Sequence, residues 1–185
     1  YAQFVKTFSQ VGIPEYLPHA FFIAGGGLAI ENALKVAMDW KVQKNFQKGH
    51  VRERGHKVLH FEKAFHGRTG YTMSLTNTIP DKTKWFAHFD WPRVSVPFIQ
   101  FPFTDEGYED LKKRETLSLA QIRQAFTDNK DDICAIIIEP IQSEGGDNHV
   151  RQEFLEQLRL ISDENDCFLI YDEVHAVFLL MQSIE

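Results

Sequence analysis

Gly25-Gly26-Gly27 combines a glycine run with the start of a helical pattern, an arrangement suited to binding an anion. Free backbone N–H groups at a helix start, together with the positive end of the helix dipole, favour a group such as phosphate. Glycines also let the backbone approach that group closely. A flexible helix entry is the alternative interpretation, because the spacing matches neither a Walker loop nor a dinucleotide-binding fingerprint.

A second group of chemically active side chains lies in Phe65-His66-Gly67-Arg68. The phenyl ring of Phe65 is able to stack on a flat ring, and Arg68 is able to hold a carboxylate through two parallel hydrogen bonds. A histidine in such a turn is more often a structural hydrogen-bonding residue than a catalyst, and we expect that role for His66.

Carboxylates follow two apolar runs later in the chain. Asp172 comes after Phe168–Tyr171, so we expect it on the floor of a cleft, where a carboxylate needs a cation or hydrogen-bond donors. A protonated pyridine nitrogen is one such partner; a helix cap or an ion pair with arginine is the alternative. Glu139 and Glu144 flank a turn that ends in Gly145-Gly146, and either is also compatible with a solvated loop charge.

The elements that position these groups alternate between strands and helices. Continuous apolar runs predict strands over residues 133–138 and 167–171, and residues 57–61 predict a short strand. Helices are predicted after Gly27, from Ser118 to about Asp128, and over residues 151–165. Ser118 begins its helix in a capping-box pattern with Gln121. Residues 79–110, with four of the seven prolines, are expected to have little regular structure.

This alternation predicts an α/β fold with a mostly parallel sheet and flanking helices. Ligands of such sheets bind at the carboxyl ends of the strands. The polar groups described above follow three predicted strands directly, so we expect them to meet at one edge of the sheet.

Composition excludes several classes of protein. The chain has 185 residues, a formal net charge of −6 and 43% hydrophobic residues, which favours a globular domain without nucleic-acid partners. No run has the roughly 18 apolar residues of a membrane span, and no signal-peptide pattern is present, so we expect a cytoplasmic protein without membrane contacts. Cys134 and Cys167 lie in apolar runs and are expected to be buried thiols.

The order of these motifs, with Glu139-Pro140-Ile141-Gln142 before Asp172-Glu173-Val174, resembles the class III aminotransferases, which use pyridoxal 5'-phosphate. The resemblance implies the large domain of a fold-type I aminotransferase, in part, over residues 1–175. Within the class, the chain is most similar to the L-lysine 6-aminotransferases. The stretches that carry this similarity are residues 28–35, 64–78, 89–93 and 139–147.

The resemblance also implies a role for each site residue. Gly26 and Gly27 would hold the cofactor phosphate, Phe65 and Val174 would lie on the two faces of the ring, and Asp172 would pair with the ring nitrogen. His175 would contact the phenolic oxygen of the cofactor. Arg68 and Glu144 would bind substrate. Glu144 would be the family's switching glutamate, which covers a downstream arginine when the amino donor is bound and frees it for 2-oxoglutarate. Glu139 would orient the site without touching the ligand. No metal is implied.

The reaction implied by the resemblance is transfer of the terminal amino group of L-lysine to 2-oxoglutarate, giving 2-aminoadipate semialdehyde and glutamate. A homodimer is the expected form of the full-length enzyme. The 4-aminobutyrate aminotransferases are the nearest alternative within the class.

The sequence differs from the family pattern at three points. The family's Schiff-base lysine follows the Asp172 strand, but no lysine follows Lys130 here. His175 stands where the family has glutamine. Residues 176–185 read as an atypical apolar tail in place of a glycine-rich loop. We therefore expect this chain alone to be inactive in transamination, and a non-catalytic protein that binds the cofactor or pairs with a full-length subunit is the second hypothesis.

Overall fold

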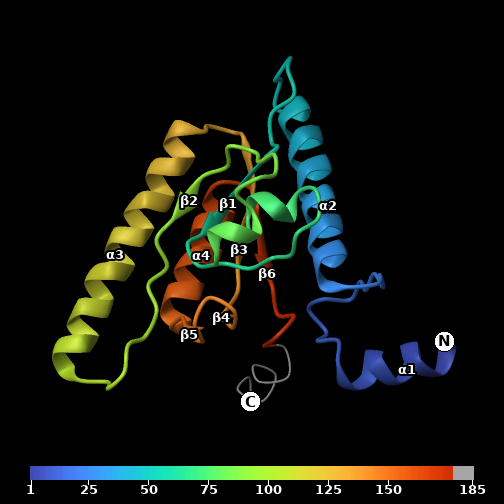
Figure 1. Ribbon diagram of the computed structural model, residues 1–185. Helices are drawn as coiled ribbons and strands as arrows, with labels where there is room; N and C mark the ends of the chain where they lie inside the picture. Colours follow the sequence, from blue (N-terminus) through green and yellow to red (C-terminus); the bar gives the residue numbers. More distant parts are fainter. Residues whose placement is uncertain (177–185) are drawn as a thin grey trace.

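A four-stranded, all-parallel sheet forms the centre of the molecule in a computed structural model that describes residues 1–176 (Figure 1). The strands are β1 (Lys57–Phe61), β2 (Arg93–Val94), β3 (Ile133–Ile138) and β6 (Phe168–Tyr171), in the spatial order β2-β1-β3-β6. The register pairs Val58 with Ala135 and Ile138 with Tyr171. The predicted α/β class and parallel sheet are confirmed.

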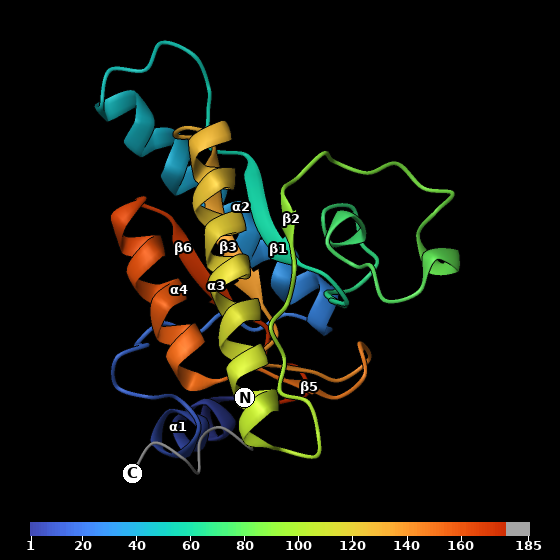
Figure 2. The same cartoon turned by 90° about the vertical axis from the view of Figure 1, so that its left-hand side faces the viewer.

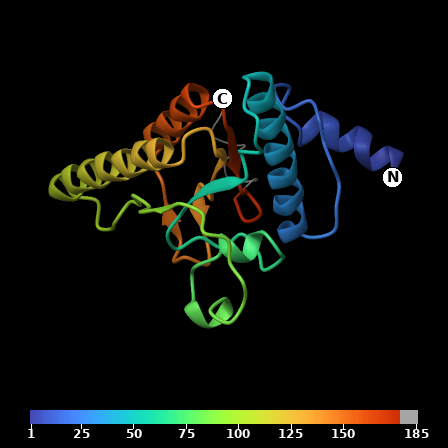
Figure 3. The ribbon, with the colours of Figure 1, turned by 90° about the horizontal axis from the view of Figure 1, so that it is seen from above.

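Helices cover both faces of this sheet. α2 (Gly26–Gln47) lies on one face, and α3 (Asp105–Asp128) and α4 (Gln152–Glu164) lie on the other, as the view from above shows (Figure 3). α1 (Ala2–Val11) lies beyond α2, contributes no buried residue and stacks the Phe4 and Phe8 rings on each other. The predicted helices after Gly27 and over residues 151–165 are confirmed.

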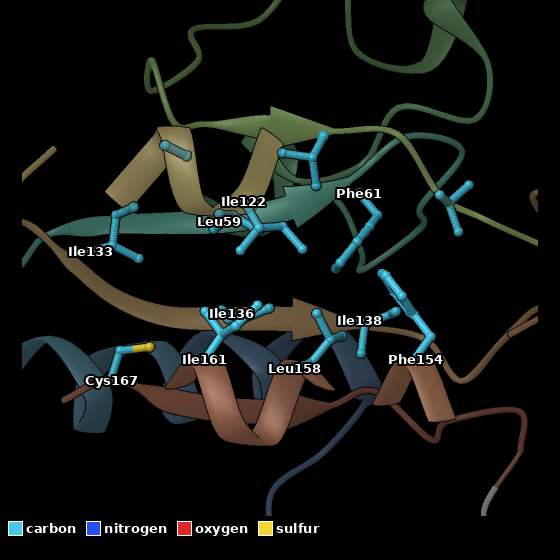
Figure 4. Packing of buried hydrophobic residues seen from close by; sticks show 13 residues of the cluster. Leu59, Phe61, Ile122, Ile133, Ile136, Ile138, Phe154, Leu158, Ile161 and Cys167 are labelled. Carbon is cyan, nitrogen blue, oxygen red and sulfur yellow. The ribbon is translucent and has the colours of Figure 1, made fainter. Parts of the chain in front are cut away.

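Two apolar cores separate the sheet from its helices. On the α3 and α4 side, Leu158 and Ile161 point toward Ile136, and Phe61 packs edge-on against Phe154 (Figure 4). On the α2 side, the sheet buries the residues Ile30, Leu34, Ala37, Val58, Leu75, Cys134, Ala135 and Ile137. All six residues of β3 are buried, as predicted for a strand covered on both faces. Both cysteines are buried free thiols, as expected.

The helix predicted to start at Ser118 begins earlier in the structure. The cap of α3 is Thr104, whose side chain accepts a hydrogen bond from the Gly107 N–H, and the helix starts at Asp105. Ser118 lies in the middle of α3, is fully buried and donates to the Ser95 carbonyl at 2.7 Å. The capping-box interpretation was therefore wrong, because this serine serves a tertiary contact.

Residues 79–110 were predicted to have little regular structure, and most of them up to the start of α3 have none. The segment between β1 and α3 projects from the sheet edge in Figure 2, with the 3-10 turn η1 (Thr72–Ser74) before the predicted range and η2 (Pro80–Lys82) within it. The prediction missed β2, whose two residues pair with β1, and the first turn of α3. It also missed the hairpin of β4 (Ile141–Gln142) and β5 (Asn148–His149) after β3.

β6 has a hydrogen-bonded neighbour on one side only among residues 1–176. Its two end residues are exposed, Phe168 at 37% and Tyr171 at 40%, and the two residues between them are half-buried. The apolar run of residues 167–171 is thus an edge strand here, less buried than β3.

The buried Lys41 joins α2 to the end of α4. Its side chain is 1% exposed, and Nζ donates to the carbonyls of Asn165 and Asp166 at 3.0 and 2.8 Å. Burial lowers the pKa of Lys41, while the nearby acidic groups act in the opposite direction. The ammonium group thus satisfies carbonyls that the helix end leaves without a partner.

Lys41→Met is expected to lower the free energy of unfolding by about 2 kcal/mol, because two partly buried carbonyls lose their donor. Urea denaturation measures the change. Lys35→Met on the same helix is the control, since Lys35 is 55% exposed and its pairing distance to Glu31 is 3.9 Å. Equal effects of the two substitutions would contradict a stabilising role for the buried bonds.

Candidate active site

Three stretches far apart in the sequence meet at the carboxyl ends of β1, β3 and β6, at the lower end of the sheet in Figure 1. A Cβ atom placed on Gly26 would lie 2.9 Å from Val174 Cγ2, and one on Gly27 would lie 3.6 Å from the Cα of Gly67. The strand order changes direction between β1 and β3, which is where parallel α/β sheets bind ligands. The predicted clustering at the strand ends is confirmed.

The first turn of α2 is open to an anion. No side chain among the described residues caps this helix. Its first backbone hydrogen bond runs from Ala29 N to Gly25 O. The N–H groups ahead of Ala29 are therefore free to donate outward. Gly25 has φ +94°, and nothing in the structure lies within 4 Å of a Cβ built on it. A phosphate group fits this end of the helix.

Asp172 is fixed at the end of β6. Its side chain is 5% exposed, its N–H donates to Ile138 O at 2.9 Å, and its Oδ1 accepts from Val174 N at 3.3 Å. Oδ2 lies 2.7 Å from His66 Nδ1. The ion pair with arginine that was the alternative is not what the structure shows, because the partner is a histidine.

His66 is buried completely and is held at both its backbone and its ring. The His66 N–H donates to Thr76 Oγ1 at 3.0 Å, and that hydroxyl donates to Gly67 O at 2.6 Å. The ring nitrogen Nε2 is buried with no hydrogen-bond partner among the described residues. The imidazole therefore acts as a rigid support for one carboxylate oxygen of Asp172, which agrees with the structural role expected for His66.

Glu139 lies directly after β3, 3% exposed, and its Oε1 accepts from Phe65 N at 2.8 Å. Burial raises the pKa of Glu139 to about 7, although His66 and the Phe65 N–H act in the opposite direction. The interpretation of Glu139 as a solvated loop charge was wrong. Its contact with Phe65 fits the predicted orienting role, because the hydrogen bond fixes the loop that carries Phe65.

Glu139→Gln is expected to flatten the pH dependence of stability between about pH 4.5 and 7. The folded state binds the Glu139 proton more tightly than the unfolded state does, so its contribution is present at low pH and is lost as pH rises through about 7. The loss amounts to at most about 3 kcal/mol in the original protein. Glutamine keeps the oxygen that accepts from Phe65, so the variant should be the more stable protein at pH 8.

Urea denaturation at pH 5 and at pH 8 measures this effect, with Glu164→Gln as the control because Glu164 lies exposed on α4. A pH dependence that is identical in the original protein and in Glu139→Gln would contradict the raised pKa.

The predicted ring-binding and substrate-binding residues surround Asp172 with different exposure. Phe65 is half-buried, and Val174 is 58% exposed and packs against Gly26. Arg68 and His175 are exposed. Their side chains face solvent beside the strand ends, so their roles toward a ligand remain predictions.

Glu144 is held by two donors that the sequence did not reveal. Its Oε1 accepts from Thr78 Oγ1 and from Lys82 Nζ, both at 2.5 Å. Partial burial raises the pKa of Glu144, but the bonds from Lys82 and Thr78 outweigh it and lower the pKa overall. Glu144 is therefore a paired carboxylate. Lys82 lies 62 residues away in the sequence, so no local pattern predicts the pair.

A cavity of about 650 Å³ lies at the opposite end of the sheet. Residues that precede β1 and β3, among them His56 and Asp132, line it. It is separate from the groups at the strand ends, and the candidate site therefore rests on side-chain geometry and not on cavity size.

The chain belongs to the class-III aminotransferases, a family whose pattern it matches over residues 2–178. Enzymes of this family use pyridoxal phosphate. The chain is 49% identical over 175 residues to the L-lysine-epsilon aminotransferase of Mycobacterium tuberculosis, covering 95% of this chain and 38% of that protein. It superimposes on the solved lysine aminotransferase of M. tuberculosis with a TM-score of 0.87 at 46% identity, covering 92% of this chain and 38% of that one.

A 4-aminobutyrate aminotransferase of Schizosaccharomyces pombe is 37% identical over 119 residues, which are 64% of this chain and 25% of that protein. The chain thus spans well under half the length of these relatives. No helix among residues 1–176 is long and apolar enough to cross a membrane.

Proposed function

We propose that this chain forms part of the pyridoxal-phosphate-binding large domain of an enzyme that transfers the terminal amino group of L-lysine to 2-oxoglutarate. The observation that most directly supports binding of this cofactor is the position of the Asp172 carboxylate. It is fixed 2.7 Å from His66 Nδ1 and lies beside the open N-terminus of α2. An acidic group for a ring nitrogen and free N–H groups for a phosphate are both present.

Each residue has a distinct task in this proposal. Asp172 keeps a proton on the ring nitrogen, and His66 keeps Asp172 in place. The N–H groups of Gly26 and Gly27 hold the phosphate, and Phe65 and Val174 contact the ring. His175 donates to the phenolic oxygen of the ring. When bound, pyridoxal phosphate supplies an electron sink for the electron pair released at the amine carbon.

Substrate recognition in the proposal relies on charge. Arg68 is an exposed guanidinium in the loop that carries Phe65, and it binds a substrate carboxylate through two parallel hydrogen bonds. The identity to the L-lysine-epsilon aminotransferases supports L-lysine as the donor, and 2-oxoglutarate is the acceptor that we propose. A homodimer is proposed for the full-length form. The apolar tail proposed for residues 176–185 falls, from residue 177 on, outside the described residues.

The test is a comparison of amino donors in a form of the protein extended to the length of its relatives. We expect L-lysine to be turned over with a higher kcat/KM than 4-aminobutyrate, with 2-oxoglutarate as acceptor and glutamate as the measured product. Faster turnover of 4-aminobutyrate would replace the lysine assignment by the 4-aminobutyrate one, which the S. pombe relative supports.

A polypeptide of residues 1–185 alone is expected to give no glutamate above the free-cofactor background, because it contains no lysine after Lys130. The second candidate is a protein that binds the cofactor or pairs with a full-length subunit without catalysis. Light scattering of the chain mixed with the extended form separates the two: a stable mixed complex supports the second candidate.

A further inference from the structure

A second cavity, of about 510 Å³, lies within the segment between β1 and α3 that projects from the sheet edge in Figure 2. Its lining residues all fall between Ser74 and Arg93, so none of the residues assigned to the candidate active site lines it. The volume is within the range of pockets that take small organic molecules.

One of the lining residues, Arg93 at the start of β2, is held by a buried imidazole. Arg93 Nε donates to His60 Nε2 at 3.0 Å, and the two residues face each other across β1 and β2. His60 is 1% exposed, and its Nδ1 lies 3.4 Å from Val58 O, so Nδ1 carries the proton and Nε2 accepts. Burial, with a further contribution from Arg93, lowers the pKa of His60 to about 3, which keeps the ring neutral.

The bond to His60 uses one of the five N–H groups of the guanidinium. Nη1 and Nη2 of Arg93 have no hydrogen-bond partner among residues 1–176, and no ion pair within that range joins Arg93 to Asp90, which lines the same cavity. The end of a guanidinium fixed in this way is able to hold both oxygens of a carboxylate through parallel N–H groups.

The charge of the lining favours a singly charged anion. Among the described lining residues, Lys84 and Arg93 are basic and Asp90 is acidic, so with neutral histidine the formal charge is 2 − 1 = +1. Lys84 also pairs with Asp81, which lies outside the lining. A single carboxylate balances this charge better than a doubly charged phosphate does.

Aromatic rings form another part of the lining. Phe89 and Trp91 stack with their ring centroids 5.0 Å apart, and Tyr71 lies 6.2 Å from Trp91. The Phe89 N–H donates to Ser74 Oγ at 2.9 Å, which fixes this part of the segment, and Phe89 is 50% exposed. An accessible ring of this kind is able to pack against an apolar or flat part of a ligand.

We propose that this cavity binds a small organic acid, whose carboxylate pairs with Arg93 and whose apolar or aromatic part packs on Phe89 and Trp91. His60 is a positioning residue in this site, because it directs the guanidinium without touching the ligand. The site is separate from the candidate active site and does not depend on the proposed function.

Calorimetric titration with phenylacetate, which has no amino or oxo group to exchange, tests the site in the form extended to the length of the relatives. Arg93→Met is expected to weaken binding about tenfold, the low end of the range for charged hydrogen bonds because Arg93 is exposed. Arg68→Met is the matched control, since Arg68 is an exposed arginine of the candidate active site, and should leave the affinity unchanged. Phenylacetamide, with the same ring and no charge, should also bind about tenfold more weakly.

Two substitutions of His60 test its positioning role. His60→Gln keeps an acceptor near the position of Nε2 and should keep the original affinity, whereas His60→Leu removes the acceptor and should weaken phenylacetate binding about threefold. Arg93→Lys keeps the charge without the fork and should also weaken binding about threefold, which gives a second measurement if Arg93→Met does not fold.

Three results would each overturn the proposal. They are no measurable binding of phenylacetate, equal losses in Arg93→Met and Arg68→Met, and equal affinities for phenylacetate and phenylacetamide. An unchanged affinity in His60→Leu would remove His60 from the site.

Discussion

Asp172→Asn is expected to lower kcat/KM for transamination on the order of 10²- to 10³-fold in a form extended to the length of the relatives. Asparagine has nearly the shape of aspartate, so the backbone bond to Ile138 is kept. What is lost is the negative charge that holds a proton on a ring nitrogen. Initial rates of glutamate formation with saturating cofactor measure the effect.

Asp163→Asn is the control for this prediction, because Asp163 pairs with Arg159 on the exposed side of α4. Affinity for pyridoxal phosphate, followed by its absorbance, should also fall in Asp172→Asn but not in Asp163→Asn. An Asp172→Asn protein with the original rate and cofactor affinity would remove Asp172 from the site.

Gly67→Ala is expected to lower the free energy of unfolding by about 4 kcal/mol and to displace the Phe65–Arg68 loop from α2. Gly67 has φ +108°, a conformation that costs an alanine about 1–3 kcal/mol. Its Cβ would also lie 2.8 Å from the Cα of Gly27, and an overpacked contact with backbone adds about 1–3 kcal/mol.

Gly49→Ala separates these two contributions. Gly49 has φ +93°, close to that of Gly67, but nothing lies within 4 Å of a Cβ built on it. Thermal unfolding of the two variants should therefore differ by the steric part alone. Equal melting temperatures in Gly67→Ala and Gly49→Ala would show that the loop tolerates separation from α2.

The sequence predicted the parts of the fold whose signal is local and strong. Lys57–Phe61 and Ile133–Ile138 have the predicted bounds because a run of apolar residues in a buried strand has no competing pattern. Ser118 misled the prediction of α3, since Ser-x-x-Gln suits a cap as well as it suits a buried serine that bonds to another segment. β2 and the β4–β5 hairpin, with two residues a strand, are too short to show a period.

The sequence predicted which residues lie at the site better than it predicted the contacts between them. A carboxylate directly after an apolar strand indicates the end of a parallel sheet, and this rule placed Glu139 and Asp172 correctly. The pairing of Asp172 with His66 joins residues 106 positions apart, and only the packed sheet determines it. Lys82 and Thr78 escaped notice for the same reason, because their partner Glu144 lies on another segment.

Asp172 directly follows β6, so ligand binding is linked to the integrity of the β3–β6 strand pair. β3 is the one strand hydrogen-bonded to β6 within the described part of the chain, so separation of this strand pair would carry Asp172 away from His66. A ligand that binds only the assembled site must then stabilise the β3–β6 pair by mass action. Amide hydrogen exchange in β6 would slow as the ligand concentration rises. The exchange rate of β6 would therefore report the fraction of protein with ligand bound.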